Sequence, residues 1–122
     1  MNFKEPENTD LIYWTRHSKE KMRFYNLSEQ RLKRILRNPQ REEKGIAPAT
    51  VAIMQKAGTK KKPSEIWLMY QKAKTKELKN QKAKKQPRIR IISAWRYPGI
   101  SPIGSPPIPE EVLRLLEQDN LV

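Results

Sequence analysis

Cysteine is absent from the 122 residues, histidine occurs once, and there is no long hydrophobic run. The absence of cysteine excludes a disulfide framework, a thiolate nucleophile and metal sites built on thiolates. A single histidine excludes a metal site with several histidines and a pair of histidines acting as acid and base. No apolar segment approaches the roughly 18–20 residues that span a bilayer. We therefore expect no metal and no membrane partner.

Signals for cofactor binding and for secretion are missing as well. The sequence contains neither G-x-x-x-x-G-K nor G-x-G-x-x-G, the glycine-rich patterns that bind nucleotide phosphates, so we expect no small-molecule cofactor. Residues 1–10 form a polar, acidic tail that is unlike a secretory signal. These features predict a cytoplasmic protein.

Acidic residues are scarce, with 13 Asp and Glu against 26 Lys and Arg and a formal net charge of +13. Residues 56–96 carry most of the excess, with 14 basic and two acidic residues. Such a charge attracts polyanions and releases counterions on binding, so we expect RNA or the ribosome as the partner. The lysines predicted to bind RNA are Lys60, Lys61, Lys62, Lys72, Lys74, Lys76, Lys79, Lys82, Lys84 and Lys85. The alternative is that they only keep surface loops soluble.

The first part of the chain predicts a short strand followed by two helices. Residues 11–14 are apolar and β-prone, and Thr15 is placed to cap a helix that begins at Arg16. After a break at residues 26–28, an apolar stripe predicts a second helix, and its members are Leu32, Ile35 and Leu36. Pro39 ends this helix because proline disfavours a helical conformation in the residue before it.

The later part of the chain predicts an antiparallel sheet. Strands are expected at residues 50–54, 65–70 and 88–95, and the middle one is apolar on both faces, which is typical of a central strand. A lysine-rich insertion at residues 72–86 extends one hairpin. We predict a single α+β domain over residues 11–97, with two N-terminal helices packed on an antiparallel sheet. A Pro-rich linker at 98–109 and a short C-terminal helix at 110–119 follow.

Short motifs in this order resemble known families. The run Trp14-Thr15-Arg16-His17-Ser18, followed by Lys21-Met22 and Leu27-Ser28-Glu29, resembles the opening of the DUF4258 family. The segment from Arg90 to Arg96 is similar to the R-I-I-S-A-R strand of BrnT-type toxins. Both groups belong to the RelE/ParE-like set of small α+β proteins. The resemblance implies a toxin–antitoxin protein that cleaves messenger RNA and is neutralised by an antitoxin-like partner.

Metal-independent cleavage of RNA needs a base, an acid and cations that stabilise the transition state. His17 is the one group with an ordinary pKa near neutrality, and Arg88, Arg90 and Arg96 share one face if their strand is unbroken. The predicted catalytic residues are His17, Arg90, Arg96 and Tyr70, and Arg88, Trp95 and Tyr97 join the predicted RNA-binding residues. The alternatives are a structural histidine, a solvated sheet face and a buried Trp95.

Three functions are consistent with these features. The first is a RelE- or BrnT-like RNA-binding protein with metal-independent endoribonuclease activity. The second is a non-catalytic module that binds RNA or the ribosome. The third is a protein-interaction module that uses the Pro-rich segment. Glu42, Glu43 and Glu65 are candidate bases by residue type alone, and the simpler interpretation places them on the surface.

Overall fold

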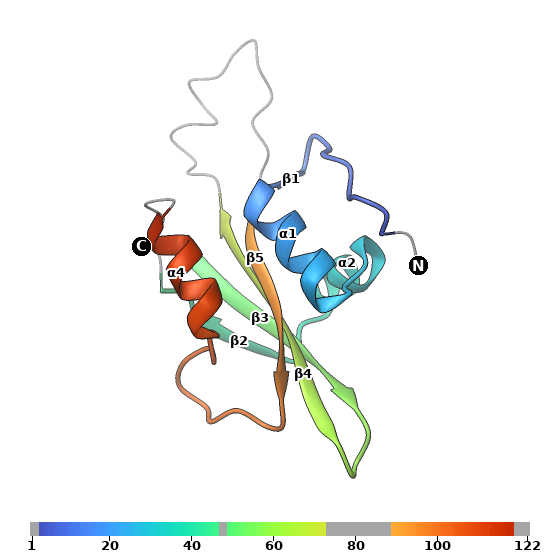
Figure 1. The fold of residues 1–122 in the computed structure, drawn as a ribbon, viewed down its shortest axis with the longest axis vertical. Coiled ribbons are helices and arrows are strands. Elements are labelled where there is room, and N and C mark those ends of the chain that lie inside the picture. Colours follow the sequence, from blue (N-terminus) through green and yellow to red (C-terminus); the bar gives the residue numbers. More distant parts are fainter. Residues whose placement is uncertain (1–2, 47–48, 73–88, 119–122) are drawn as a thin grey trace.

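The protein is described by a computed structural model for residues 3–46, 49–72 and 89–118. The elements follow the order β1 (Ile12–Trp14), α1 (Arg16–Tyr25), α2 (Glu29–Arg37), β2 (Arg41–Lys44), β3 (Thr50–Gly58), β4 (Pro63–Lys72), β5 (Ile89–Pro98) and α4 (Glu110–Gln118). Helices α1 and α2 lie on one face of a five-stranded sheet, and α4 lies on the other face (Figure 1). The predicted α+β fold, with two N-terminal helices on a mostly antiparallel sheet, is confirmed.

The strand order is β1-β5-β4-β3-β2, so β4 is central, as its apolar sequence predicted. Strands β2 to β5 pair in antiparallel fashion, whereas β1 pairs with β5 in parallel, with Ile12 opposite Ile89. Strand β2 was not predicted from the sequence. All four of its residues are charged, and strand propensity gives no signal in such a segment.

The helix boundaries follow from local capping. The Thr15 side chain accepts a hydrogen bond from the backbone N–H of Ser18 at the start of α1, and Ser28 does the same for Arg31 at the start of α2. Asn26 ends α1 in the left-handed conformation, at φ 56°, which asparagine tolerates better than most residues. The predicted cap at Thr15 and the predicted break between the two helices are thereby confirmed.

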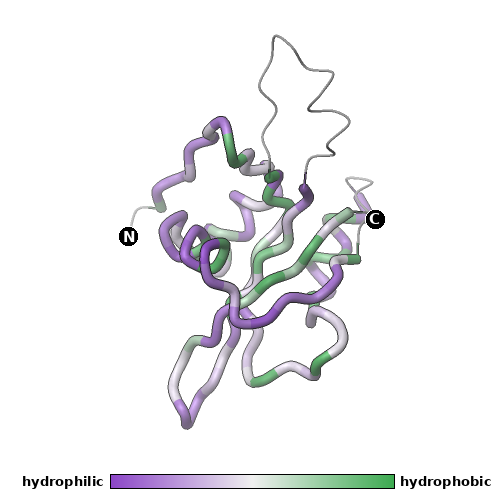
Figure 2. Tube along the Cα trace, turned by 180° about the vertical axis from the view of Figure 1, so that it is seen from behind, coloured by the Kyte–Doolittle hydropathy of each residue, from purple (hydrophilic) through white to green (hydrophobic). Residues whose placement is uncertain are grey.

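Two hydrophobic cores lie on the two faces of the sheet. Met22 of α1 and Leu32 and Ile35 of α2 pack on one face, and Val112 and Leu116 of α4 pack on the other. Hydrophobic residues lie along β3, β4 and β5, and hydrophilic residues form the tip of the β3–β4 hairpin (Figure 2). The C-terminal helix therefore belongs to the same folded unit as the sheet. Within the described residues, no helix is long and apolar enough to cross a membrane.

Candidate nucleic-acid interface

The outer surface of α1 and α2 carries the densest positive charge on the described elements. Residues 16–37 contain eight Lys and Arg against two Glu, a surplus of six positive charges. Both acids already pair with cations of their own helix, Glu20 with Arg16 at 3.4 Å and Glu29 with Lys33 at 2.9 Å. We call the outward-facing cations of these helices the helix face, and they are Arg16, Lys19, Arg23, Lys33, Arg34 and Arg37.

Four of the six cations of the helix face form no ion pair with a described residue, and one of them is Lys19. In the part of the chain that the structure describes, Arg23, Arg34 and Arg37 form no ion pair. Arg34 and Arg37 are exposed on α2, and Arg23 is exposed on α1, where its guanidinium lies 5.2 Å from the Phe3 ring. These cations are therefore available to phosphate groups in solution.

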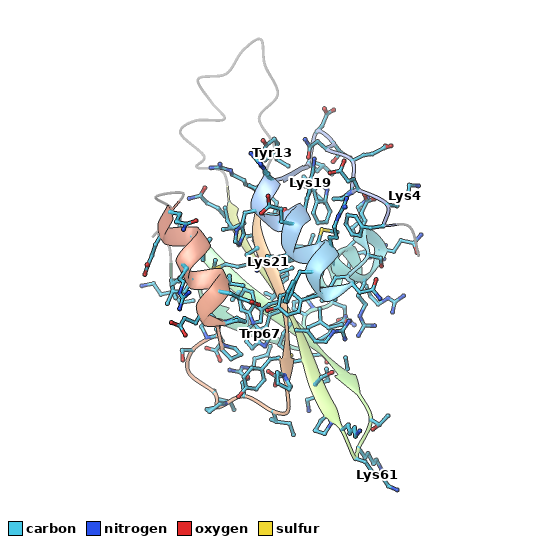
Figure 3. All side chains as sticks on the ribbon, in the orientation of Figure 1. Lys4, Tyr13, Lys19, Lys21, Lys61 and Trp67 are labelled. Carbon is cyan, nitrogen blue, oxygen red and sulfur yellow. The ribbon has the colours of Figure 1, made fainter. Side chains whose placement is uncertain are left out.

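Aromatic rings are exposed among these cations. The Phe24 side chain is 64% exposed, and the ammonium of Lys21 lies 4.9 Å from its ring centroid. Tyr13, 40% exposed, lines a hollow of about 510 Å³ together with Arg16, Lys19 and Arg23 and the acids Glu5 and Glu20. Tyr13 and Lys19 lie near the start of α1 (Figure 3). Cations beside exposed rings suit a nucleic acid, because phosphates and bases then both find partners.

The described lysines that were predicted to bind RNA lie at opposite ends of β4. Lys60, Lys61 and Lys62 are exposed in the turn before this strand, and Lys61 stands at the tip of the hairpin (Figure 3). Lys72 is the last residue of the strand. Strand β4 separates Lys62 from Lys72 by about 30 Å, so these described lysines do not form one compact site. The remaining predicted positions lie outside the described residues, and they are Lys74, Lys76, Lys79, Lys82, Lys84, Lys85 and Arg88.

The prediction that the arginines of β5 share one face is wrong. A bulge at Ile92 shifts the register of β5 against β4, because Met69 pairs with Ser93 whereas Tyr70 pairs with Ile91. Arg96 consequently faces the side of the helix pair, where its Nη2 donates to the Tyr25 carbonyl at 3.4 Å. Arg90 is exposed on the opposite face, so the two guanidinium groups do not converge.

His17 lies inside the protein at the start of α1. It is 5% exposed, and its Nε2 lies 2.8 Å from the Ser93 hydroxyl on the neighbouring strand. This contact ties α1 to β5 and fits the structural alternative for this histidine. The 2′-hydroxyl of an RNA chain does not reach an imidazole buried to this extent without local opening.

The aromatic candidates divide between core and surface. Trp95 is completely buried and stacks on Trp67 at 6.1 Å, so the prediction that it binds RNA bases is wrong. Tyr70 is buried on the helix side of β4, and burial, with the nearby charge of Glu42, raises the pKa of its phenol. It stays protonated at neutral pH. Tyr97 keeps part of its surface exposed near the end of β5.

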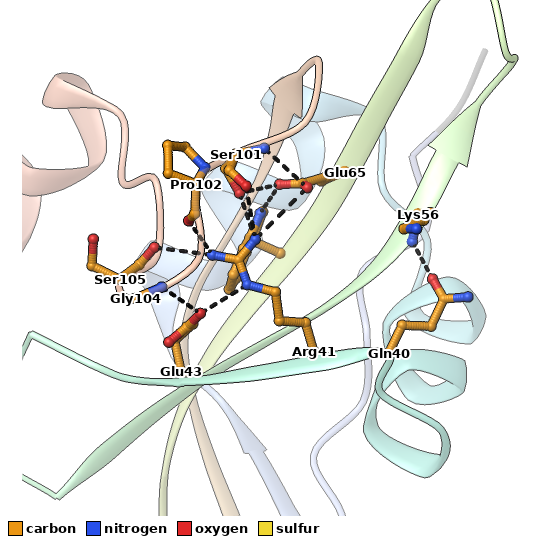
Figure 4. A network of polar contacts seen from close by, with 10 residues as sticks. Gln40, Arg41, Glu43, Lys56, Glu65, Ser101, Pro102, Gly104 and Ser105 are labelled. Carbon is orange, nitrogen blue, oxygen red and sulfur yellow. Dashed lines mark hydrogen bonds and ion pairs between the residues drawn. The ribbon is translucent and has the colours of Figure 1, made fainter.

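A polar cluster around Arg41 was not predicted from the sequence. Its charged groups contact other residues of the protein (Figure 4). The Arg41 Nε donates to the Glu43 carboxylate at 2.8 Å, Nη1 donates to the Ser101 hydroxyl at 2.9 Å, and Nη2 donates to the Pro102 carbonyl at 2.6 Å. Two longer bonds reach the carbonyls of Ser101 and Ser105. We call this group, with Glu65, the Arg41 clamp.

Glu65 completes the clamp from the centre of the sheet. It is 1% exposed, accepts hydrogen bonds from the Trp67 indole at 2.9 Å and the Ser101 hydroxyl at 2.6 Å, and lies 3.9 Å from Arg41. Glu43 accepts from the Gly104 backbone N–H, and this bond, with Arg41, lowers the pKa of its carboxyl. The sequence-based interpretation of Glu65 as a surface acid is wrong, because this residue is buried.

The same contacts correct the prediction that residues 98–109 form a linker. The clamp fixes this segment to the sheet through its backbone and Ser101, so it continues the folded unit toward α4. One sequence signal pointed to the clamp, because Glu65 is the single charge in the predicted central strand. A buried carboxylate there requires a partner, although nothing in the sequence identifies Arg41 as that partner.

No protein-family model matches this chain, and comparisons with curated proteins and with solved structures find no match. The resemblance to DUF4258, BrnT-type and RelE-like proteins therefore stays a prediction. Function has to be argued from the surface and its charges.

Proposed function

We propose that this protein binds RNA through the helix face, with the Lys60–Lys62 turn as a second contact. The observation that carries the proposal is the surplus of six positive charges on residues 16–37, where three arginines have no anionic partner among the described residues. Cations of this kind bind the phosphate backbone by releasing counterions. Exposed Phe24 and Tyr13 add surfaces on which unpaired bases stack.

Binding without cleavage is the version that the geometry supports best. A metal-independent endoribonuclease needs its acid, base and cations around one phosphate. Of the four predicted catalytic residues, His17 and Tyr70 are buried, and Arg90 lies on the face opposite to Arg96. The ribosome remains the predicted source of the RNA, and an antitoxin-like partner remains a prediction of the resemblance alone.

The experiment that tests this proposal incubates the full chain with a labelled mixed-sequence RNA in EDTA and follows both binding and RNA length. We expect a complex that weakens as salt is raised, with the RNA left intact. Cleavage that persists in EDTA would establish the nuclease hypothesis instead. An RNA that stays unbound at 50 mM salt would reject both.

A further inference from the structure

Arg96 lines two hollows on the protein surface. One, of about 630 Å³, lies beside the turn between α1 and α2, and its charged lining residues are Lys4, Glu5, Glu29, Arg31 and Arg96. The other, of about 590 Å³, lies where β5 ends, and its lining includes Tyr25, Tyr97 and Arg96. Both volumes fall within the range of roughly 300–1,000 Å³ typical of ligand sites. Because Arg96 lines both, the two hollows are neighbours beside the C-terminal end of α1, and we call them together the groove.

The first hollow has the chemistry of a phosphate site. The Nε of Arg31 is buried and has no hydrogen-bond partner among the described residues, which is costly for a charged donor. Within the part of the chain that the structure describes, the Arg96 side chain makes a single long hydrogen bond, at 3.4 Å, and leaves other guanidinium donors for a ligand. The nearby Glu29 is engaged by the Lys33 ammonium at 2.9 Å and by the Glu7 backbone N–H. Its charge therefore competes little for the arginines.

The second hollow has the chemistry of a base site. Tyr25 and Tyr97 contribute two aromatic rings, and prolines of the segment before α4 form the remaining wall. The Tyr25 hydroxyl donates to the Glu111 carboxylate, which fixes the ring between α1 and α4. A ring held in place before binding loses little entropy when a base stacks on it.

We propose that this groove holds one unpaired nucleotide of a single-stranded RNA, with its phosphate beside Arg31 and Arg96 and its base against Tyr25 and Tyr97. The proposal rests on the proposed function and adds a preference for single strands. Stacking on Tyr97 requires a base that is free of its own pairing partner, whereas the helix face binds phosphates in either form.

The test compares two matched pairs of variants in binding a single-stranded RNA and a duplex of the same sequence. R96Q and R90Q remove one charge each from the same strand, one inside the groove and one on the opposite face. Tyr97→Ala removes the ring, and Tyr97→Phe keeps it. We expect R96Q and Tyr97→Ala to weaken single-strand binding roughly tenfold, while Tyr97→Phe stays close to the parent. R90Q should have a smaller effect, equal on both RNAs.

Photocrosslinking of the unaltered chain keeps the proposal testable if Tyr97→Ala fails to fold. RNA containing 4-thiouridine should crosslink to Tyr97 or Tyr25. Crosslinks found only on the helix face or on the Lys60–Lys62 turn would overturn the groove and leave the proposed function intact. Equal losses for R96Q and R90Q would overturn it as well. Absence of any RNA binding would overturn both proposals together.

Discussion

Arg41 and the arginines of the helix face differ in what their guanidinium groups contact. Arg41 donates to Glu43 and to Ser101, Pro102 and Ser105, and its guanidinium lies 5.0 Å from the Trp67 ring. Arg34 and Arg37 lie in solvent with no ion pair in the described residues. The comparison shows that the same side chain stabilises the fold in one place and remains available to a ligand in the other.

The difference arises from what lies opposite each arginine. Strand β2 places Arg41 against the buried carboxylate of Glu65 and the backbone of the Pro-rich segment. Helix α2 places its apolar stripe on the sheet, so Arg34 and Arg37 necessarily point outward. The buried guanidinium of Arg41 requires partners for its charge and its donors, whereas the exposed guanidinium groups of Arg34 and Arg37 are solvated by water and require none.

Substitution of Arg41 is expected to have the largest effect on stability. Arg41→Ala leaves the Glu65 carboxylate buried without its cation and releases the Pro-rich segment, so the free energy of unfolding should fall by about 3–5 kcal/mol. Arg34→Ala is the matched control and should change it by less than about 0.5 kcal/mol. Denaturant unfolding of the two variants measures both values. Equal losses would remove the distinction between the two regions.

Acidification is expected to weaken the Arg41 clamp, and the loss of stability should be smaller than that caused by Arg41→Ala. The Gly104 N–H and Arg41 lower the pKa of Glu43 from its ordinary 4.5, so the ionised carboxylate stabilises the fold at neutral pH. This contribution is present above pH 4.5 and is lost as the pH falls through the lowered pKa. Thermal unfolding between pH 7 and pH 3 should show the loss, and Glu43→Gln should flatten the profile. An unchanged profile in that variant would assign the acid sensitivity to other carboxyls.

Substitution of Phe24, an exposed aromatic residue among the cations of the helix face, should give the smallest effect of the three. Phe24→Ala removes an exposed ring, so stability should stay within about 0.5 kcal/mol of the parent. Single-stranded RNA binding should weaken by about 1 kcal/mol, roughly fivefold, because one stacking surface is lost. Phe24→Tyr keeps a ring and should bind normally. Fluorescence anisotropy measures both, and unchanged binding by Phe24→Ala would leave only phosphates as contacts of this surface.

Local signals in the sequence predicted most of the fold. Thr15 and Pro39 act on their own neighbours, so their effects were visible without tertiary structure. The parallel pairing of β1 with β5 and the charged strand β2 were not predicted, because both depend on partners distant in sequence.

The candidate site was predicted less well. Even spacing placed Arg90 and Arg96 on one face, and the bulge at Ile92 reversed one of them. No feature of the sequence predicts such a bulge. Glu65 was visible as an acid within an apolar strand, whereas its partners, Arg41 and Ser101, come from charged and Pro-rich segments with no pattern of their own. The sequence shows how many positive charges the chain carries and where they are dense along it. Only the fold shows how these charges are distributed over the two faces of the sheet.

The central claim is that the unpaired cations of the helix face bind phosphates, and the salt dependence of RNA binding tests it most directly. The variant R23Q/R34Q/R37Q removes three such cations, and K44Q/K56Q/R114Q removes the same charge from β2, β3 and α4. We predict that the slope of log K against log salt falls by about 2 in the first variant, because each phosphate contact on a single strand contributes roughly 0.7. The second variant should keep nearly the parent slope. Equal reductions in the two variants would contradict the claim.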